Sequence, residues 1–473
     1  MRVHSRLRLR PIGAARNHPT TRAGRTIRAR RPAPSPARVL ATAVTVFALI
    51  GLVSGSWAAR IPDVASRVGA THASLGVALF CISAGALISM QTAGALCARW
   101  GAGRVTATGA ALVSAGIALP AVAPSLGTLC AALLAFGAAT GLVNVAANAL
   151  GVRLQHGLGR PVMSTMHAGF SFGGLFGALS GGLVSAYLPV HWHLIAVAAL
   201  GVGVALAIRP TLTRFADAAD DPSGPADALD EPGADHGASA RPVRAGGAGP
   251  VIVLLGMIAG CTAFAEGALT DWASLHLRED LHAVPALAAA GYAAFSLAMG
   301  VARLLGRRLI LKYGDTAVLV VGGMLAALGM LTGALTPSPY AALAGFVLVG
   351  FGLANVFPLA IAKAGLLRGA RGVARASTVG YGGLLGGPPI IGLVAGGLGL
   401  PGALTAVSVL AVLAAVLALV VDLRLHGEKS VAAALRAQAR ARLEPVAARI
   451  GSAAQSHGDS LYLLLDQDRT PVA

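Results

Sequence analysis

Twelve long apolar stretches, separated by short polar segments, dominate the pattern of this chain. They fall into two sets of six. The first set is 39–59, 75–97, 105–123, 127–149, 163–187 and 191–208, and the second is 250–274, 285–306, 315–335, 341–362, 377–398 and 403–422. A helix of about 20 apolar residues crosses the roughly 30 Å hydrocarbon core of a bilayer. The pattern therefore predicts an all-α membrane protein with twelve transmembrane helices.

The composition agrees with this prediction. The chain of 473 residues is 55% hydrophobic and only 12% charged, whereas soluble domains carry about 25% charged residues. Its mean hydropathy is +0.72. The four cysteines all lie in apolar stretches and show no CxxC or zinc-binding spacing, so we predict no metal site and no cofactor.

Three polar segments divide the chain into domains. Residues 1–38 are rich in Arg and Pro without any acid, which predicts a disordered cytoplasmic tail. Residues 209–249 have the Asp, Gly and Pro content of a cytoplasmic linker. Residues 423–473 form a C-terminal tail, with a short helix that we expect to end at Pro445. The two six-helix bundles are then 39–208 and 250–422.

The basic residues of the short loops predict the orientation. Eleven lie on the side of the N-terminus, against three, Arg60, Arg67 and Arg278, in the loops on the other side. The eleven are Arg99, Arg104, Arg153, Arg160, Arg307, Arg308, Lys312, Lys363, Arg368, Arg371 and Arg375. Because basic loops stay inside, we expect a multi-pass protein of the plasma membrane, the cell inner membrane, with both termini cytoplasmic. The net charge of +18 concentrates in the N-terminal tail and in loops on one side of the membrane, so it does not predict a nucleic-acid partner.

The two sets of apolar stretches also repeat each other in sequence. Three pairs of segments match at offsets of 211, 209 and 213 residues: 141–145 with 352–356, 173–177 with 382–386, and 100–101 with 313–314. Near-equal offsets at corresponding stretches indicate a duplicated six-helix unit, and therefore two pseudo-symmetric bundles. Many secondary transporters are built in this way.

Glu266 is the acid that lies deepest in an apolar stretch. If its helix enters the membrane near Pro250, Glu266 lies roughly 24 Å deep and Asp271 roughly 31 Å deep, where Trp272 would anchor the helix at the interface. A charge inside hydrocarbon costs about 2.5 kcal/mol or more, which favours a functional role. The alternative is a neutral Glu266 that joins helices by a hydrogen bond.

Several polar residues are candidates for the same pathway as Glu266. Thr262 and Thr270 lie four residues to either side of it and extend a polar stripe that we expect to face a cavity. The other candidates are Gln91, Asn144, Asn148, His167 and Asn355. For the amides, interhelical hydrogen bonds are the alternative, and for His167 a place at the membrane interface.

The segment 94–104 resembles the loop motif G-x-L-a-D-r-x-G-r-k/r of the major facilitator superfamily. Arg99, Gly101 and Arg104 match this motif, whereas Ala98 stands where the motif has Asp. The second half repeats the motif without the acid but with Arg303 and Gly314. The resemblance covers about 39–422. It implies the major facilitator fold and a gating role for these arginines and glycines.

Three further segments resemble one bacterial branch of that superfamily. Residues 266–274 are similar to its E-G-A-x-x-D-W-S segment, and residues 56–62 and 166–171 also look like this branch. The branch is described as related to sugar permeases such as the fucose–proton symporter. This resemblance implies the class of transporter and leaves the cargo open.

Glycines at every fourth position favour a different kind of transporter, an exporter. Gly173, Gly177 and Gly181, together with 383–389, resemble the exporter motif G-x-x-x-G-P-x-x-G-G of the superfamily. The alternative is that small residues simply allow helices to pack closely.

We therefore predict a monomeric secondary active transporter that moves a small-molecule substrate by alternating access, with a proton carried by Glu266 as coupling ion. One alternative is a proton-driven exporter of drugs or amphipathic metabolites. Another is a membrane sensor on the same fold that transports nothing. A membrane enzyme would need His, Asp or Cys clustered at one interface, and the sequence contains no such cluster.

Overall fold

A computed structural model describes residues 34–159, 162–219 and 248–466, and all the regular structure in these ranges is helical. The helices are α1 (Pro36–Val68), α2 (His72–Trp100), α3 (Ala102–Gly116), α4 (Ala118–Val122), α5 (Leu126–Leu158), α6 (Met163–Val184), α7 (Val190–Ala219), α8 (Ala248–Glu279), α9 (Pro285–Tyr313), α10 (Asp315–Leu335), α11 (Pro339–Leu353) and α12 (Val356–Asp466).

The predicted tails and linker lie partly outside the described residues. Residues 1–33, 220–247 and 467–473 are not described, so most of the predicted N-terminal tail and linker is untested. The C-terminal segment is helical as far as Asp466. The predicted helix end at Pro445 is therefore wrong, because α12 keeps its helical backbone through that proline.

Within the described ranges, ten helical stretches are long and apolar enough to cross a membrane. Helix α6 is not one of these ten, because ten of its 22 residues are Gly, Ser or Thr. Residues Arg371–Leu425 count as one stretch of 55 residues. This stretch is interrupted at Gly399, whose φ of 73° is outside the helical range.

Two glycines end α2 and α9 in the same way. Gly101 has a φ of 83° and donates its N–H to the Cys97 carbonyl at 2.9 Å. Gly314 has a φ of 80° and donates to the Ile310 carbonyl, also at 2.9 Å. A side chain is strained at such a φ, so glycine is required at both positions. These caps lie 213 residues apart, so the matching segments of the sequence repeat also have the same backbone conformation.

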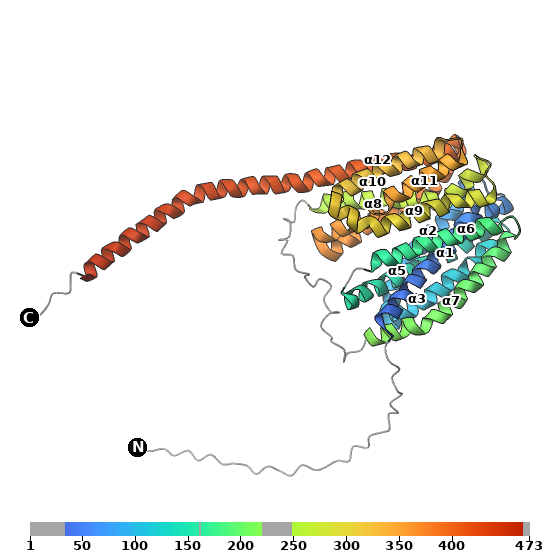
Figure 1. The fold of residues 1–473 in the computed structure, drawn as a ribbon, viewed down its shortest axis with the longest axis horizontal. Coiled ribbons are helices and arrows are strands. Elements are labelled where there is room, and N and C mark those ends of the chain that lie inside the picture. The colour runs from blue at the N-terminus through green and yellow to red at the C-terminus, as the bar shows by residue number, and fades with distance from the viewer. Residues whose placement is uncertain (1–33, 160–161, 220–247, 467–473) are drawn as a thin grey trace, which may run out of the picture. The chain divides into compact units, whose positions relative to one another are not determined.

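The helices pack in two groups, which we call the N-half (α1–α7) and the C-half (α8–α12) (Figure 1). In the N-half, α1 packs on α6, α2 on α5, and α3 on both α5 and α7. In the C-half, α8 packs on α12, and α10 on α11 and α12. Four helix pairs join the halves: α6 with α9, α2 with α12, α1 with α8, and α1 with α9.

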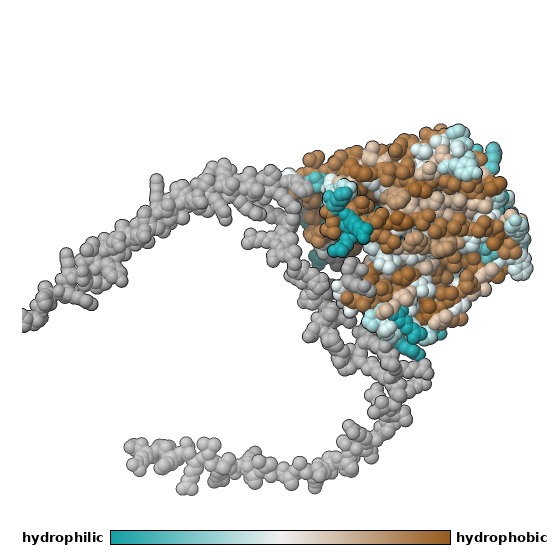
Figure 2. Space-filling view, viewed as in Figure 1, coloured by the Kyte–Doolittle hydropathy of each residue, from teal (hydrophilic) through white to brown (hydrophobic). Residues whose placement is uncertain are grey.

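The two ends of the helices differ. We call the end where α1 and α8 begin and α7 finishes the linker end, and the opposite end, where α1 and α8 finish, the far end. Figure 2 shows that apolar residues cover most of the helix sides and that hydrophilic residues gather at the ends. This distribution suits helices whose sides face lipid.

The glycines of α1 and α6 bring these helices into backbone contact. A Cβ atom on Gly173 would lie 2.0 Å from the Ala48 carbonyl oxygen, and one on Gly177 would lie 2.2 Å from that of Leu52. In the C-half, a Cβ on Gly383 would lie 2.0 Å from the Gly260 oxygen. Close packing therefore accounts for Gly173, Gly177 and Gly383 among the glycines that resemble an exporter motif.

This packing predicts the effect of one added methyl group. Gly173→Ala should lower stability by about 1–3 kcal/mol, because the Ala48 backbone has to move. The melting temperature of the purified protein in detergent measures the effect. Gly94→Ala on α2 is the matched control, since nothing lies within 4 Å of its added Cβ. Equal melting temperatures for the two variants would contradict the close α1–α6 contact.

Candidate functional site

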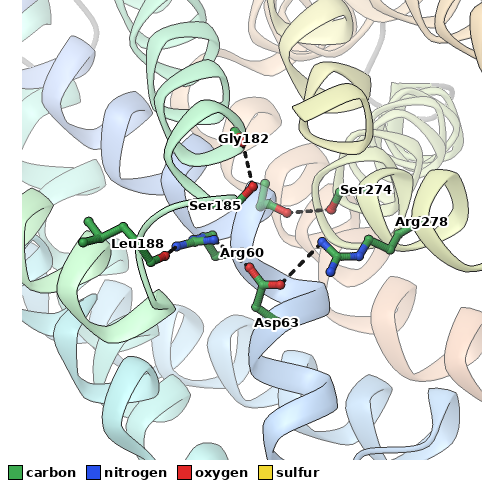
Figure 3. Close-up of polar contacts among 8 residues, drawn as sticks. Arg60, Asp63, Gly182, Ser185, Leu188, Ser274 and Arg278 are labelled. Atoms are coloured by element: carbon green, nitrogen blue, oxygen red, sulfur yellow. Dashed lines mark hydrogen bonds and ion pairs between the residues drawn. The ribbon is translucent and has the colours of Figure 1, made fainter. Parts of the chain in front are cut away.

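Polar contacts join the two halves at the far end, as Figure 3 shows. Ser274 on α8 donates its hydroxyl proton to the Ala58 carbonyl of α1 at 2.6 Å. Arg278, one turn further along α8, pairs with Asp63 of α1 at 3.5 Å. We call these two contacts the far-end seal. They hold α1 and α8 together next to the ends of both helices.

Asp63 is held in place for the far-end seal by a buried arginine. Arg60 is 1% exposed, and its Nη1 donates to the Asp63 carboxylate at 2.8 Å. Its Nη2 donates to the Leu188 carbonyl, which follows α6. The sequence places Arg60 in an outer loop, but α1 continues to Val68, so Arg60 lies within the helix. A buried guanidinium with a carboxylate and a carbonyl partner keeps this part of the N-half rigid.

A second polar contact crosses between the halves beside the seal. His72, the first residue of α2, lies 2.8 Å from Glu279, the last residue of α8. Its ring also meets the edge of the Trp272 indole, with 6.3 Å between centroids. Trp272 is 0% exposed. The prediction that Trp272 anchors α8 at a membrane interface is therefore wrong, because the N-half covers it.

Nearer the middle of the helices lies a central polar network. Arg303 on α9 pairs through Nη2 with Glu266 on α8, and the two atoms are 3.5 Å apart. Its Nη1 donates to the Ser171 hydroxyl of α6 at 3.1 Å. Ser296, also on α9, donates to the Ser171 carbonyl at 2.9 Å. Glu266 is thus linked through Arg303 to the other half of the molecule.

The geometry of this network leaves part of its hydrogen-bonding capacity unused. The side chain of Arg303 is 14% exposed and that of Glu266 is 32% exposed. A charge-assisted N–H···O bond is usually about 2.7–2.9 Å long, so the 3.5 Å pair is loose. An incoming polar group can therefore compete for the guanidinium without breaking a short bond.

The two threonines of the predicted stripe bond to their own helix. Thr262 is 1% exposed and donates to the Ile258 carbonyl at 3.0 Å. Thr270 donates to the Glu266 carbonyl at 2.8 Å. Neither hydroxyl proton is left over for a substrate, so a cavity-facing role for these threonines stays a prediction.

The predicted asparagines form hydrogen bonds within their own halves. Asn148 donates to the Asn144 side-chain oxygen at 2.6 Å and to its carbonyl at 2.8 Å. Asn355 lies in the turn between α11 and α12 and donates to the Ala302 carbonyl of α9 at 3.1 Å. Its amide oxygen occupies the space where a Cβ on Gly306 would lie. All three amides are partly buried, and a shared cavity stays a prediction.

The remaining candidates lie toward the linker end. Gln91, Arg99 and Arg104 are exposed. His167 is partly buried and packs edge-on against Phe47, with ring centroids 5.0 Å apart. Gly101 and Gly314 shape the caps described above. Arg303, by contrast, bonds to Glu266 and Ser171 rather than to the other loop-motif residues.

Sequence reasoning missed the partners Ser171, Ser296 and Asp63, although one further signal was present. Ser56-Trp57 in α1 and Asp271-Trp272 in α8 match at an offset of 215. Both tryptophans are buried, at 2% and 0% exposure. This pair marks the repeat-related segments of α1 and α8 that meet at the far-end seal.

Comparison with known proteins identifies the family. The sequence profile of the Major Facilitator Superfamily matches residues 42–360 and 254–457, which together span most of the chain. The chain belongs to the major facilitator superfamily. The loop glycines that carried the resemblance therefore belong to a member of this superfamily.

Similar sequences come from bacteria. An uncharacterized MFS-type transporter of Yersinia pestis is 32% identical over 363 residues, covering 74% of this chain and 87% of the relative. The uncharacterized transporter y4wD of Sinorhizobium fredii is also 32% identical, over 358 residues, covering 74% and 89%. Membrane protein MosC of Rhizobium meliloti is 29% identical over 385 residues, covering 81% and 90%. This superfamily member is therefore a multi-pass membrane transporter.

Solved structures share the fold at low sequence identity. A bacterial homologue of the human lysosomal transporter Spinster, in an inward-facing and unoccupied conformation, has a TM-score of 0.64 and 17% identity, with 83% of this chain and 98% of that chain covered. The nucleoside transporter NupG has a TM-score of 0.56 and 16% identity, with 82% and 99% covered. No specific likeness to a fucose permease emerges from these structures.

The central polar network predicts a coupled pair of mutations. Arg303→Met should lower stability by about 1–2 kcal/mol, because it leaves the Glu266 carboxylate partly buried without its cation. Adding Glu266→Gln should recover part of the loss. Melting temperatures of both single variants and the double variant measure this coupling. The control is Arg307→Met, one turn along α9 and exposed, for which we expect a change within about 0.5 kcal/mol. Equal losses at Arg303 and Arg307 would show that the Glu266 pair contributes nothing.

Proposed function

We propose that this chain is a proton-coupled secondary transporter that moves a small polar solute by alternating access between its two halves. The observation that carries the proposal is the central polar network, in which Arg303 links Glu266 of the C-half to Ser171 of the N-half. Transporter sites of this kind lie where repeat-related halves meet. A site there can respond to both the substrate and the position of the halves.

The count of membrane spans supports the two-bundle architecture. To the ten candidate stretches within the described ranges we add α6, which is about 33 Å long. Division of the Arg371–Leu425 stretch at Gly399 adds a twelfth span. The halves then contain six spans each, with bundles near 39–208 and 250–422. We further propose that both termini are cytoplasmic and that the protein is a monomer in the plasma membrane.

The positions of contacts and exposed side chains support a conformation closed at the far end. The far-end seal and the pair of His72 with Glu279 join the halves there. Toward the linker end, Gln91 on α2 and Arg307 on α9 are exposed. In the predicted orientation, the site then opens to the cytoplasm.

Protonation of Glu266 provides a simple coupling step. A proton on its carboxylate removes the negative charge that attracts Arg303, so the guanidinium becomes free to bind a polar group of the substrate. Loss of the proton restores the ion pair and releases that group. Substrate and proton thereby bias the same two-state equilibrium.

Among the alternatives, uptake has the stronger support. The glycine runs that favour export are accounted for by the α1–α6 and α8–α12 packing. A charged network at the middle of the halves suits a small polar solute better than an amphipathic one. A sensor that transports nothing would not need a seal that can open, so transport assays on this chain separate the two classes.

The topology can be tested in intact cells. A cysteine introduced as Asp230→Cys, in a background without the four native cysteines, should resist a membrane-impermeant thiol reagent until the cells are permeabilised. This result follows from the excess of basic residues in the loops on the same side. Labelling of position 230 from outside would overturn the proposed orientation.

The coupling role of Glu266 has its own test. Glu266→Gln keeps the size of the side chain and imitates its neutral form. In proteoliposomes screened over sugars and other small polar solutes, this variant should lose accumulation driven by a pH gradient while substrate exchange persists. Ser171→Ala serves as a control that removes a partner of Arg303 but no acid, and its accumulation should stay dependent on the pH gradient. Unchanged pH-driven accumulation by Glu266→Gln would assign Glu266 a structural role.

A further inference from the structure

A second acid of α8, Asp271, has no partner in the closed conformation. It lies eight residues before the end of the helix at Glu279 and is partly buried. Among the described residues, it has neither a hydrogen bond nor an ion pair, although Glu266 on the same helix pairs with Arg303. An unpaired carboxylate inside a helical bundle is costly unless it is neutral, so its place requires an explanation.

Asp271 lies on the face of α8 that carries the far-end seal. Steps of three and four residues place Asp271, Ser274 and Arg278 on one side of the helix. Ser274 and Arg278 both contact α1 of the N-half. Asp271 therefore lies one turn from the seal, on the side that faces the opposite half. Its neighbour Trp272 is fully covered.

The charged and titratable groups around this position are occupied elsewhere. On α1, Arg60 pairs with Asp63, and on α2, His72 pairs with Glu279. Also on α8, the buried His276 pairs with Asp280, and Glu266 pairs with Arg303 of α9. Further titratable groups on the packed helices include Tyr292 on α9 and Tyr381 on α12. Tyr292 is 3% exposed. None of these groups forms an ion pair with Asp271 among the described residues.

From this geometry we propose that Asp271 must take up a proton before the far-end seal can close. The proposal rests on the alternating access proposed above. When the far end is open, water solvates an ionised Asp271. Closure replaces that water by α1 without supplying a cation, so the ionised form opposes closure and the neutral form permits it.

The two acids of α8 then have different roles. Glu266 exchanges its proton against an arginine and acts on the substrate, whereas Asp271 is a positioning residue that acts on the gate. The step at Asp271 is a simple protonation: a hydronium ion from the far side transfers a proton to one carboxylate oxygen and leaves as water. The empty carrier would close at its far end only after this step, which links gate movement to the proton gradient.

The test uses a buried reporter between the halves near the far end. Ala289 on α9 is 1% exposed, and its Cβ lies 2.6 Å from where a Cβ on Gly182 of α6 would be. Ala289→Cys, in the full chain without the native cysteines, should react with a maleimide only while the far end is open. Purified protein in lipid nanodiscs removes any dependence on orientation. Gly94→Cys, which is exposed, corrects for the reactivity of the thiol at each pH.

With Asp271 present, corrected labelling of Ala289→Cys should rise at least about fivefold between pH 5.5 and pH 8.5, since one titrating proton permits up to about tenfold per pH unit. Asp271→Asn should label slowly at every pH, with less than about a twofold change. Asp271→Glu, which restores the acid, should recover the pH dependence. Normal elution in size-exclusion chromatography confirms that each variant is folded.

Three results would overturn the proposal: no pH dependence in the parent, retained pH dependence in Asp271→Asn, or fast labelling of Asp271→Asn at all pH values. The labelling does not depend on a transported substrate. Glu266→Gln should keep the pH dependence of labelling even though it loses pH-driven accumulation. If the proposed coupling at Glu266 is wrong, the transport assay therefore shows it, whereas the labelling assay tests Asp271 alone.

Discussion

The cost of placing charge between apolar helices governs how the two halves of this protein meet. Each acid at the interface needs a cation, water or a proton, because neither hydrocarbon nor packed helices solvate a carboxylate. Glu266 has Arg303, Asp63 has Arg60 and Arg278, and Glu279 has His72. Polar pairs therefore join the halves, and the proposed alternating access would break and re-form them.

Glycines allow these partnerships to form. Because α1 and α6 approach at Gly173 and Gly177 to backbone contact, the N-half is a tightly packed unit, which the proposed alternating access would move as one body. The same holds for α8 and α12 at Gly383. Glycine contacts thus hold the helices of each half together. The polar contacts between the halves are the ones that the proposed transport cycle would break and re-form.

The position of Arg303 shows how the fold changes the meaning of a motif. By its place in the repeated loop motif it belongs with the gate at the linker end, but its long side chain reaches along α9 to Glu266 on α8. The motif glycines, in contrast, do what the pattern requires: Gly101 and Gly314 adopt the positive φ that ends α2 and α9. The two repeats therefore share the backbone conformation of the motif, but not the contacts of its side chains.

Hydropathy and the repeated motifs determined the helical membrane fold and the transporter family, because span length and backbone conformation depend on local sequence. Glu266 was also found from sequence, since an acid in an apolar run stands out. Ser171, which Arg303 links to Glu266, lies 95 residues before Glu266 and could not be found, because a serine in a glycine-rich helix carries no signal by itself. Only the packing of α6 against α9 placed it beside Arg303. Likewise, the sequence alone assigned Arg60 to a loop and Trp272 to a membrane interface. The structure buries both residues, within α1 and α8 respectively.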